Sequence, residues 1–159
     1  MRILSLFYGH DANCALLEDG EPVVVLEKER ITRIKHDQGF MDLEPILETY
    51  GWTPDSIDIV VICPRVRPTL DGRMLQWDLQ GSTYEANPEY LKEGWVGPVE
   101  YRYSQHRIRL FGRWYEGYAV DHHLAHVAGA LFTAPFEEAC LLTADGGGDF
   151  KMCALAYGS

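Results

Sequence analysis

The amino-acid sequence predicts an α/β domain, in which one sheet is combined with a few helices. Three observations predict this class. The first 27 residues alternate apolar runs with polar turns, as consecutive strands do. A short stretch with helical periodicity follows near residue 43, and residues 57–62 form an apolar, β-branched run typical of a buried strand. Strands, then a helix, then a buried strand are the order expected of an α/β sheet.

Length and composition exclude several classes of protein. A chain of 159 residues can build one domain with a real core. Its formal net charge of −10 argues against non-specific binding to nucleic acid or to an anionic membrane. The start is not a signal peptide and no run approaches membrane-spanning length, so we expect a cytoplasmic protein. The four scattered cysteines are expected to be small buried thiols: Cys14, Cys63, Cys140 and Cys153.

The chain begins with three predicted strands. Residues 2–8 form the first, and residues 9–13 (GHDAN) form a tight turn. Residues 14–17 and 23–27 form the second and third strands. Asp19-Gly20 stands between them, and this dipeptide between two apolar runs is a strong hairpin signal.

A charged connector and a helix come next. Residues 29–37 are expected to form a solvated face, as most charge runs do. Residues 43–50 show the apolar spacing of a short amphipathic helix. We expect Asp42 to cap it, Pro45 to lie in its first turn and Gly51 to end it.

The pattern weakens between residues 64 and 117. This stretch holds nine of the nineteen aromatic residues and is nearly neutral, with eight Lys/Arg and seven Asp/Glu over residues 65–117. We interpret residues 65–117 as an excursion over the sheet. Either its aromatic residues cover the core while its arginines face water, or the two kinds together shape the mouth of a substrate site or a partner surface. These residues are Trp77, Tyr84, Trp95, Tyr101, Arg102, Tyr103, Arg107, Arg109, Arg113 and Trp114.

Residues 121–126 (DHHLAH) carry the strongest candidate site. Asp121 is a good N-cap, and an apolar stripe follows at helical spacing: Leu124, Val127, Ala128 and Leu131. At about 100° per residue, this stripe lies nearly opposite His122 and His126, whose rings project side by side. Gly129 leaves room above those rings. His123 points to the flank of the stripe and is the weaker ligand candidate.

An aspartate after the next strand completes the candidate site. Residues 139–144 predict a buried strand that ends in Asp145 and residues 146–149 (GGGD). Two imidazoles with one carboxylate suit a catalytic divalent metal. The alternative, a capped helix with solvated histidines, stays open. Residues 150–157 predict a hairpin partner, after which no closing helix follows, so we expect an incomplete unit.

Four motifs in this order resemble the N-terminal part of the O-carbamoyltransferases. They are residues 9–12 (GHDA), 27–37 (EKERITRIKHD), 120–128 (VDHHLAHVA) and 142–148 (LTADGGG). That family includes the carbamoyltransferases of nodulation factors and of aminoglycoside and cephamycin biosynthesis. The resemblance spans nearly the whole chain except residues 65–117. It implies an actin/Hsp70/sugar-kinase-like fold, ribonuclease-H-like in strand order, related to the enzymes that attach threonylcarbamoyl to tRNA.

The resemblance also implies a reaction. Carbamoyl phosphate and ATP give a carbamoyl-adenylate, and the carbamoyl group passes to the hydroxyl of a small-molecule acceptor. His122, His126 and Asp145 match metal ligands, with a fourth aspartate beyond residue 159. The metal is expected to be Fe²⁺, although Zn²⁺ and Mn²⁺ also suit two histidines and one aspartate.

Two further positions take roles from the same resemblance. His10 and Lys35 match positions that contact the carbamoyl or phosphate moiety. Without the family, His10 reads as a turn histidine and Lys35 as an exposed lysine. Gly146, Gly147 and Gly148 can bring backbone N–H groups to phosphate, although a plain hairpin is the simpler reading.

Family members run several times this length, so we expect an N-terminal portion that is active only with the missing C-terminal portion or with a partner subunit. No membrane or nucleic-acid partner is expected. A second hypothesis is a non-catalytic fragment that binds a partner through residues 65–117 and an unfinished sheet edge. A third is a phosphotransferase of the same fold. The two histidines argue against the third, since kinases hold Mg²⁺ through carboxylates and phosphates.

Overall fold

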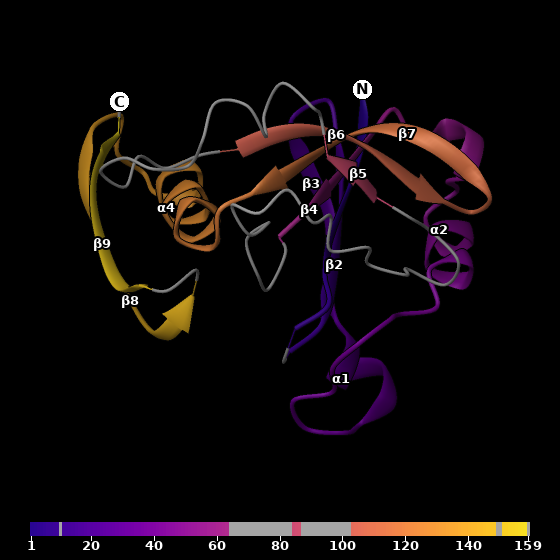
Figure 1. Ribbon diagram of the computed structural model, residues 1–159, viewed down its shortest axis with the longest axis horizontal. Helices are drawn as coiled ribbons and strands as arrows, with labels where there is room; N and C mark the ends of the chain where they lie inside the picture. Colours follow the sequence, from indigo (N-terminus) through magenta and orange to yellow (C-terminus); the bar gives the residue numbers. More distant parts are fainter. Residues whose placement is uncertain (10, 64–83, 87–102, 149–150, 159) are drawn as a thin grey trace.

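The computed structural model describes residues 1–9, 11–63, 84–86, 103–148 and 151–158 (Figure 1). The strands are β1 (Arg2–Phe7), β2 (Asn13–Glu18), β3 (Glu21–Glu27), β4 (Ile59–Ile62), β5 (Tyr84–Ala86), β6 (Tyr103–Leu110), β7 (Arg113–Val120), β8 (Ala139–Gly148) and β9 (Lys151–Gly158). The helices are α1 (Lys28–Thr32), α2 (Glu44–Thr49) and α4 (His122–Thr133), with a 3₁₀ turn at Pro54–Ser56.

Seven strands form one mixed sheet, in the order β3-β2-β1-β4-β7-β6-β5. Strand β4 runs parallel to both of its neighbours, β1 and β7, whereas the other pairs are antiparallel. Strands β8 and β9 form a separate two-stranded sheet. The α/β class predicted from the sequence is therefore confirmed.

The opening of the chain follows the sequence closely. Strands β1, β2 and β3 lie within about two residues of their predicted bounds. Asp19 and Gly20 both have positive φ, 52° and 91°, as a tight hairpin with two left-handed residues requires. Here the local turn chemistry alone determines which strands pair.

The hydrophobic core is shared by the main sheet and α2. Leu4 and Leu6 of β1 are 0% and 2% exposed, since alternate residues of the strand point to the same face. Ile46 and Leu47 bring the apolar side of α2 into the same cluster. This core stabilises the central strands, which carry one wall of the cleft described below.

The predicted cap of α2 is wrong. The helix begins after Leu43, which makes no side-chain capping hydrogen bond, and Asp42 lies exposed one residue earlier. Leu43 is 2% exposed, so its burial in the core fixes where the helix starts. The charged connector contains the five-residue helix α1, which has no buried residue and so agrees with a solvated segment.

Part of the predicted excursion belongs to the main sheet. Strands β6 and β7 form a hairpin whose second strand pairs with β4, so residues 103–117 are not an excursion. Tyr115 packs into the core, while Trp114 and Tyr103 stay exposed. Arg107 stacks over the exposed Trp114 ring at 5.3 Å. Residues 65–83 and 87–102 of the predicted excursion lie outside the described residues.

Strand β8 was predicted to be buried, but one of its faces is exposed. Helix α4 packs along the β8–β9 hairpin, as Figure 1 shows. Only one face of β8 is covered, because Leu141 is 8% exposed and Leu142 is 72% exposed. Cys140 and Cys153 lie exposed in this hairpin, so the expectation of four buried thiols is also wrong.

The hairpin itself is confirmed, with β8 and β9 antiparallel. The three glycines are not its turn: β8 runs on to Gly148, which pairs with Lys151, after a register shift that begins beyond Ala144. Among the described residues, no helix is both long and apolar enough to cross a membrane.

A glycine in β7 offers a test of this packing. A Cβ atom at Gly117 would lie 2.4 Å from Ile108 Cδ1 and 3.0 Å from the Val60 carbonyl oxygen. We therefore expect Gly117→Ala to lower the free energy of unfolding by about 1–3 kcal/mol, measured by urea denaturation.

Gly129→Ala is the matched control, because nothing lies within 4 Å of a Cβ atom there. In a helix this change should be neutral or stabilise by up to ~1 kcal/mol. If Gly117→Ala were as stable as wild type, β7 would not pack against β6 and β4 as described.

Candidate metal centre

The start of α4 is fixed by a buried cap. Asp121 is 5% exposed, and its Oδ1 accepts hydrogen bonds from the backbone N–H groups of His123 (2.9 Å) and Leu124 (3.2 Å). These donors would otherwise have no partner within the helix. The predicted cap is thus confirmed, and it sets the rotation of every later side chain about the helix axis.

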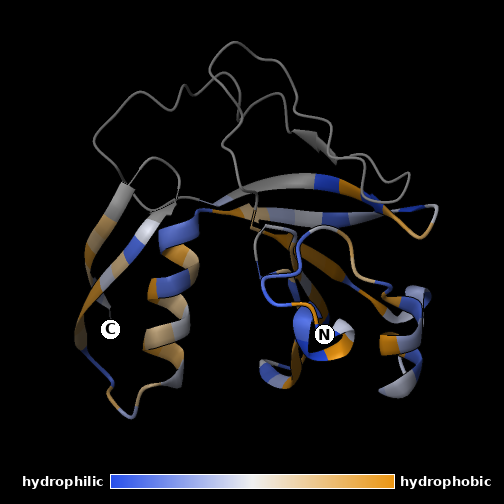
Figure 2. Ribbon diagram, turned by 90° about the horizontal axis from the view of Figure 1, so that it is seen from below, coloured by the Kyte–Doolittle hydropathy of each residue, from blue (hydrophilic) through white to orange (hydrophobic). Residues whose placement is uncertain are grey.

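The two predicted metal ligands of α4 lie side by side. His122 and His126 are one turn apart, and their Nε2 atoms are 3.1 Å from each other. Their ring centroids are 4.6 Å apart. In Figure 2, hydrophilic and apolar residues alternate along the first turns of α4, and the apolar residues continue further along the helix. The sequence-predicted geometry of the pair is present.

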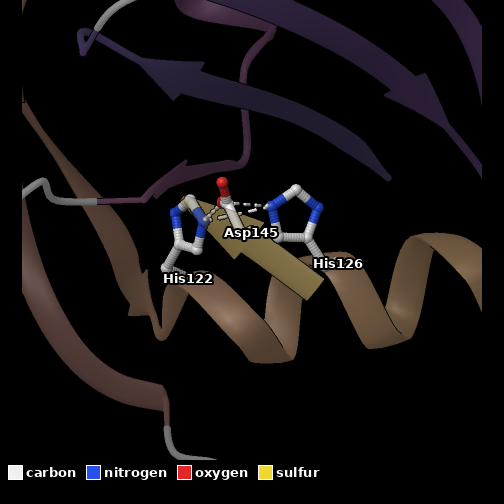
Figure 3. A group of neighbouring side chains, drawn as sticks. All are labelled: His122, His126 and Asp145. Carbon is white, nitrogen blue, oxygen red and sulfur yellow. Dashed lines mark hydrogen bonds and ion pairs between the residues drawn. The ribbon is translucent and has the colours of Figure 1, made fainter. Parts of the chain in front are cut away.

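Asp145 brings a carboxylate to the same point. From β8, its Oδ2 lies 2.5 Å from His122 Nε2 and 3.5 Å from His126 Nε2 (Figure 3). The structure therefore places one donor atom from each of the three predicted residues within 4.8 Å of the other two. We call His122, His126 and Asp145 the trio.

The spacing of the trio fits a single ion. With metal–ligand bonds of about 2.1 Å, separations of 3.1 Å and 3.5 Å correspond to ligand–metal–ligand angles of about 95° and about 113°. Both angles lie near those of octahedral and tetrahedral coordination. The 2.5 Å separation is that of a short hydrogen bond and would widen when an ion replaces the shared proton.

The electrostatics of the trio favour a charged carboxylate. The hydrogen bond from His122, helped by the backbone N–H of Gly146, lowers the pKa of Asp145 to about 2 against the opposing effect of desolvation. Asp145 is therefore ionised near neutral pH. An ionised carboxylate is the form that binds a divalent cation.

The trio lies at an open cleft of about 670 Å³. The opposite wall comes from the main sheet, chiefly the end of β1, the start of β2 and the residue after β4. Its lining residues include Ser5, Phe7, Asp11, Asn13 and Cys63, with Ala125, Ala130 and Thr143 beside the trio. A small ligand can therefore reach the trio from solvent.

The other predicted site residues are less closely assembled. His10 lies outside the described residues, and Lys35 is exposed in the turn after α1. Their sequence neighbours are in contact, because His36 Nδ1 lies 2.6 Å from Asp11 Oδ1. Gly146 is exposed next to the trio, and Gly147 and Gly148 continue β8.

Sequence reasoning missed two features. His123, set aside as a ligand, is completely buried and lies 2.7 Å from the Thr143 hydroxyl. Asp11, Glu29 and His36 bring three donor atoms within 4.8 Å of one another. Each depends on residues distant in sequence, and only the helical position of His123 beside the apolar stripe pointed to burial.

The family follows from comparison with known proteins. Residues 2–158 match the family model described as "Carbamoyltransferase N-terminus". The chain belongs to this family. The match covers nearly every residue, including the strands that line the cleft and the helix that carries the histidines.

Two relatives match most of the chain. The nodulation protein NolNO of Sinorhizobium fredii is 29% identical over an alignment of 156 residues, which covers 94% of this chain and 21% of that protein. The uncharacterized protein sll1178 of Synechocystis sp. is 28% identical over an alignment of 171 residues, gaps included, which covers 95% of this chain and 26% of that protein. The chain therefore spans about a quarter or less of the length of these relatives.

The carboxylate of the trio gives a pH-dependent prediction. Because the pKa of Asp145 is lower in the folded chain than its ordinary 3.8, its ionised form stabilises the fold above about pH 4. This contribution is lost as the pH falls through the folded-state pKa. We expect metal-free wild type to lose about 1 kcal/mol more than Asp145→Asn between about pH 5 and about pH 2.

Urea denaturation at each pH measures this difference, and the variant serves as the reference for all other titrating groups. Equal pH dependence in the two proteins would contradict a hydrogen bond between His122 and ionised Asp145.

Proposed function

We propose that this chain forms the metal- and carbamoyl-phosphate-binding part of an ATP-dependent O-carbamoyltransferase. The observation that carries the proposal is the trio, which gathers two imidazoles and an ionised carboxylate at an open cleft. Membership of the carbamoyltransferase N-terminus family supports the choice of reaction. The order β3-β2-β1-β4-β7, with β1 antiparallel to β2 and parallel to β4, supports a ribonuclease-H-like fold of the actin/Hsp70/sugar-kinase group.

The proposed reaction moves a carbamoyl group in two stages. Carbamoyl phosphate, water and ATP give a carbamoyl-adenylate with release of phosphate and pyrophosphate. The hydroxyl oxygen of a small-molecule acceptor then attacks the carbamoyl carbon, loses its proton and releases AMP. A divalent cation bound by the trio would hold phosphate oxygens and polarise the carbamoyl carbonyl. Fe²⁺ is the ion we expect, with Zn²⁺ and Mn²⁺ as alternatives that also suit the donor set.

The protein's own residues hold and orient the reactants. His122 and His126 present neutral nitrogen donors from a rigid helix, and Asp145 supplies the negative charge. Lys35 would supply a positive charge to phosphate from its exposed turn. His10 would orient the carbonyl or move a proton.

The backbone N–H groups of Gly146, Gly147 and Gly148 would contact phosphate beside the trio. The N–H of Gly146 already donates a hydrogen bond to Asp145 Oδ1, at 2.5 Å. It could not donate an equally strong hydrogen bond to phosphate at the same time. The two remaining glycines are therefore the better phosphate contacts in this proposal.

Complete catalysis would need residues outside the matched region of the relatives. Because the match covers 21% and 26% of those proteins, we propose that the fourth metal ligand, much of the nucleotide site and the acceptor pocket come from the remainder, on the same polypeptide or on a partner subunit. The four cysteines are free thiols, which supports a reducing compartment such as the cytoplasm.

Binding of a protein partner is a second candidate function with an observation in its favour. The face of β8–β9 that turns away from α4 exposes large apolar side chains: Leu142 (72%), Leu155 (72%) and Tyr157 (65%). Exposed apolar surfaces of this kind mark interaction sites. This function and metal binding use opposite faces of the hairpin, so one does not exclude the other.

Metal content tests the proposal directly. We expect the purified chain, reconstituted without oxygen with Fe²⁺ or with Zn²⁺, to retain about one ion per chain by elemental analysis. A His122→Ala/His126→Ala double variant removes two of three ligands and should retain almost none. His36→Ala is the control, because this exposed histidine belongs to a different cluster and its loss should leave the metal content unchanged.

An equal metal content in the wild type and the double variant, both folded by circular dichroism, would reject the trio as the binding site. No metal in either protein would reject metal binding by this chain alone.

A further inference from the structure

His123 of α4 has no role in the proposed function. Among the histidines whose side chains the structure describes, it is the one that is fully buried, at 0% exposure. It shares the inward side of α4 with Val127, the other buried residue of that helix. Its ring stands at 80° to the ring of His122, with the centroids 5.4 Å apart. A buried imidazole next to a metal ligand needs a physical explanation, since polar groups are costly to bury without a partner.

The partner of this imidazole lies on β8. His123 Nδ1 is 2.7 Å from Thr143 Oγ1, and Thr143 is 9% exposed. Whichever of the two groups donates, the hydrogen bond crosses from the helix to the strand. The same hydroxyl lies 3.5 Å from the Ala154 carbonyl oxygen on β9, so the contact reaches both strands of the hairpin. A hydrogen bond withdrawn from water in this way is strong and directional.

The hydrogen bond runs beside the contact that builds the trio. Thr143 and Asp145 are two residues apart on β8 and therefore share a face of the strand. His123 and His122 are adjacent on α4. Two neighbouring contacts thus join the same helix to the same strand: His123 to Thr143 in the interior, and His122 to Asp145 at the cleft.

The far end of the helix is held differently. A Cβ atom at Gly158 would lie 2.5 Å from Leu131 Cδ2, so α4 approaches β9 closely there through an apolar side chain. Apolar packing tolerates small sliding movements, whereas a buried hydrogen bond of 2.7 Å does not. A slip of one residue along a helix moves a side chain by about 1.5 Å. That is several times the tolerance of about 0.2 Å on metal–ligand distances.

We propose that His123 and Thr143 form a positioning pair, which fixes the spacing of α4 and β8 and thereby holds the two histidines at the correct distance from Asp145. The pair itself touches neither the metal nor the substrate. This inference rests on the proposed function in that the trio binds a metal ion. Outer partners that orient metal ligands typically change metal affinity by about 10–100-fold when removed.

Two substitutions at Thr143 separate the hydrogen bond from the volume of the side chain. Thr143→Val keeps the shape and removes the hydroxyl, and Thr143→Ser keeps the hydroxyl. The affinity for Zn²⁺ would be measured by competition with a chromogenic chelator, and folding by circular dichroism. We expect Thr143→Val to bind Zn²⁺ about 10-fold or more weakly and Thr143→Ser to stay within about 3-fold of wild type.

Thr133→Val is the matched control. It removes a threonine hydroxyl that bonds to the Gly129 carbonyl oxygen within α4, at 2.7 Å, away from the trio. Its Zn²⁺ affinity should equal that of wild type. If folded Thr143→Val bound Zn²⁺ as tightly as Thr143→Ser, the positioning role would be overturned.

A second readout works without metal. In the metal-free chain, the proton between His122 Nε2 and Asp145 should give a downfield imidazole N–H signal by NMR. We expect Thr143→Val to shift or lose this signal while Thr143→Ser and Thr133→Val keep it. If the wild type bound no Zn²⁺ but the variants showed this pattern, the proposed metal function would be rejected and the positioning role of His123 and Thr143 would be upheld. An unchanged signal in Thr143→Val would overturn the positioning role.

If Thr143→Val does not fold, the same measurements apply to His123→Asn and His123→Leu. Asparagine places an amide donor near the position of Nδ1, whereas leucine only fills space. The positioning role predicts that Asn retains more Zn²⁺ affinity and more of the downfield signal than Leu, and equal values for the two variants would overturn it.

Discussion

The contact between helix α4 and strand β8 is the constraint on which the candidate site depends. Two of the three proposed ligands come from the helix and the third comes from the strand, so the site exists only where these elements meet. Asp121 fixes the first turn of the helix by accepting two backbone hydrogen bonds. The one-turn spacing of His122 and His126 then follows from helix geometry, and only the approach of β8 remains to be set by tertiary packing.

A short hydrogen bond joins the helix to the strand at this contact. It runs between His122 and the ionised Asp145. The second histidine stays near the same oxygen, at 3.5 Å. The opposite wall of the cleft is built by the main sheet and includes Asp11 and Asn13. The two sheets of the chain therefore contribute different parts of one cleft, the donor atoms from the small sheet's side and polar lining from the large one.

Local sequence patterns predicted the parts of the structure that depend on local geometry. The Asp19-Gly20 hairpin, the cap at Asp121 and the pairing of His122 with His126 all involve residues within a few positions of one another. Asp145, predicted as the third ligand, lies beside the two histidines in the structure. That prediction used the general position of a carboxylate at the end of a strand.

Predictions that needed distant contacts were less successful. Strand β7 was overlooked because Gly117 interrupts its apolar alternation, and the reason for that glycine is the close approach of Ile108 from β6. The apolar run of β8 predicted a strand buried on both faces. Leu142 is nevertheless exposed, because α4 covers one face only. The role of His123 depends on Thr143, twenty residues later. The positions of His10 and Lys35 came from the family resemblance, and no pattern in the sequence replaces it.

The number and type of ligands around a bound ion test the central claim most directly. X-ray absorption at the zinc K-edge, on the chain loaded with one equivalent of Zn²⁺, reports the imidazole count and the bond lengths. The trio predicts two imidazoles at about 2.0–2.1 Å, with the rest of the shell made of oxygen. A shell of oxygen alone, a third imidazole or a sulfur ligand would contradict the account, because none of these can come from His122, His126 and Asp145.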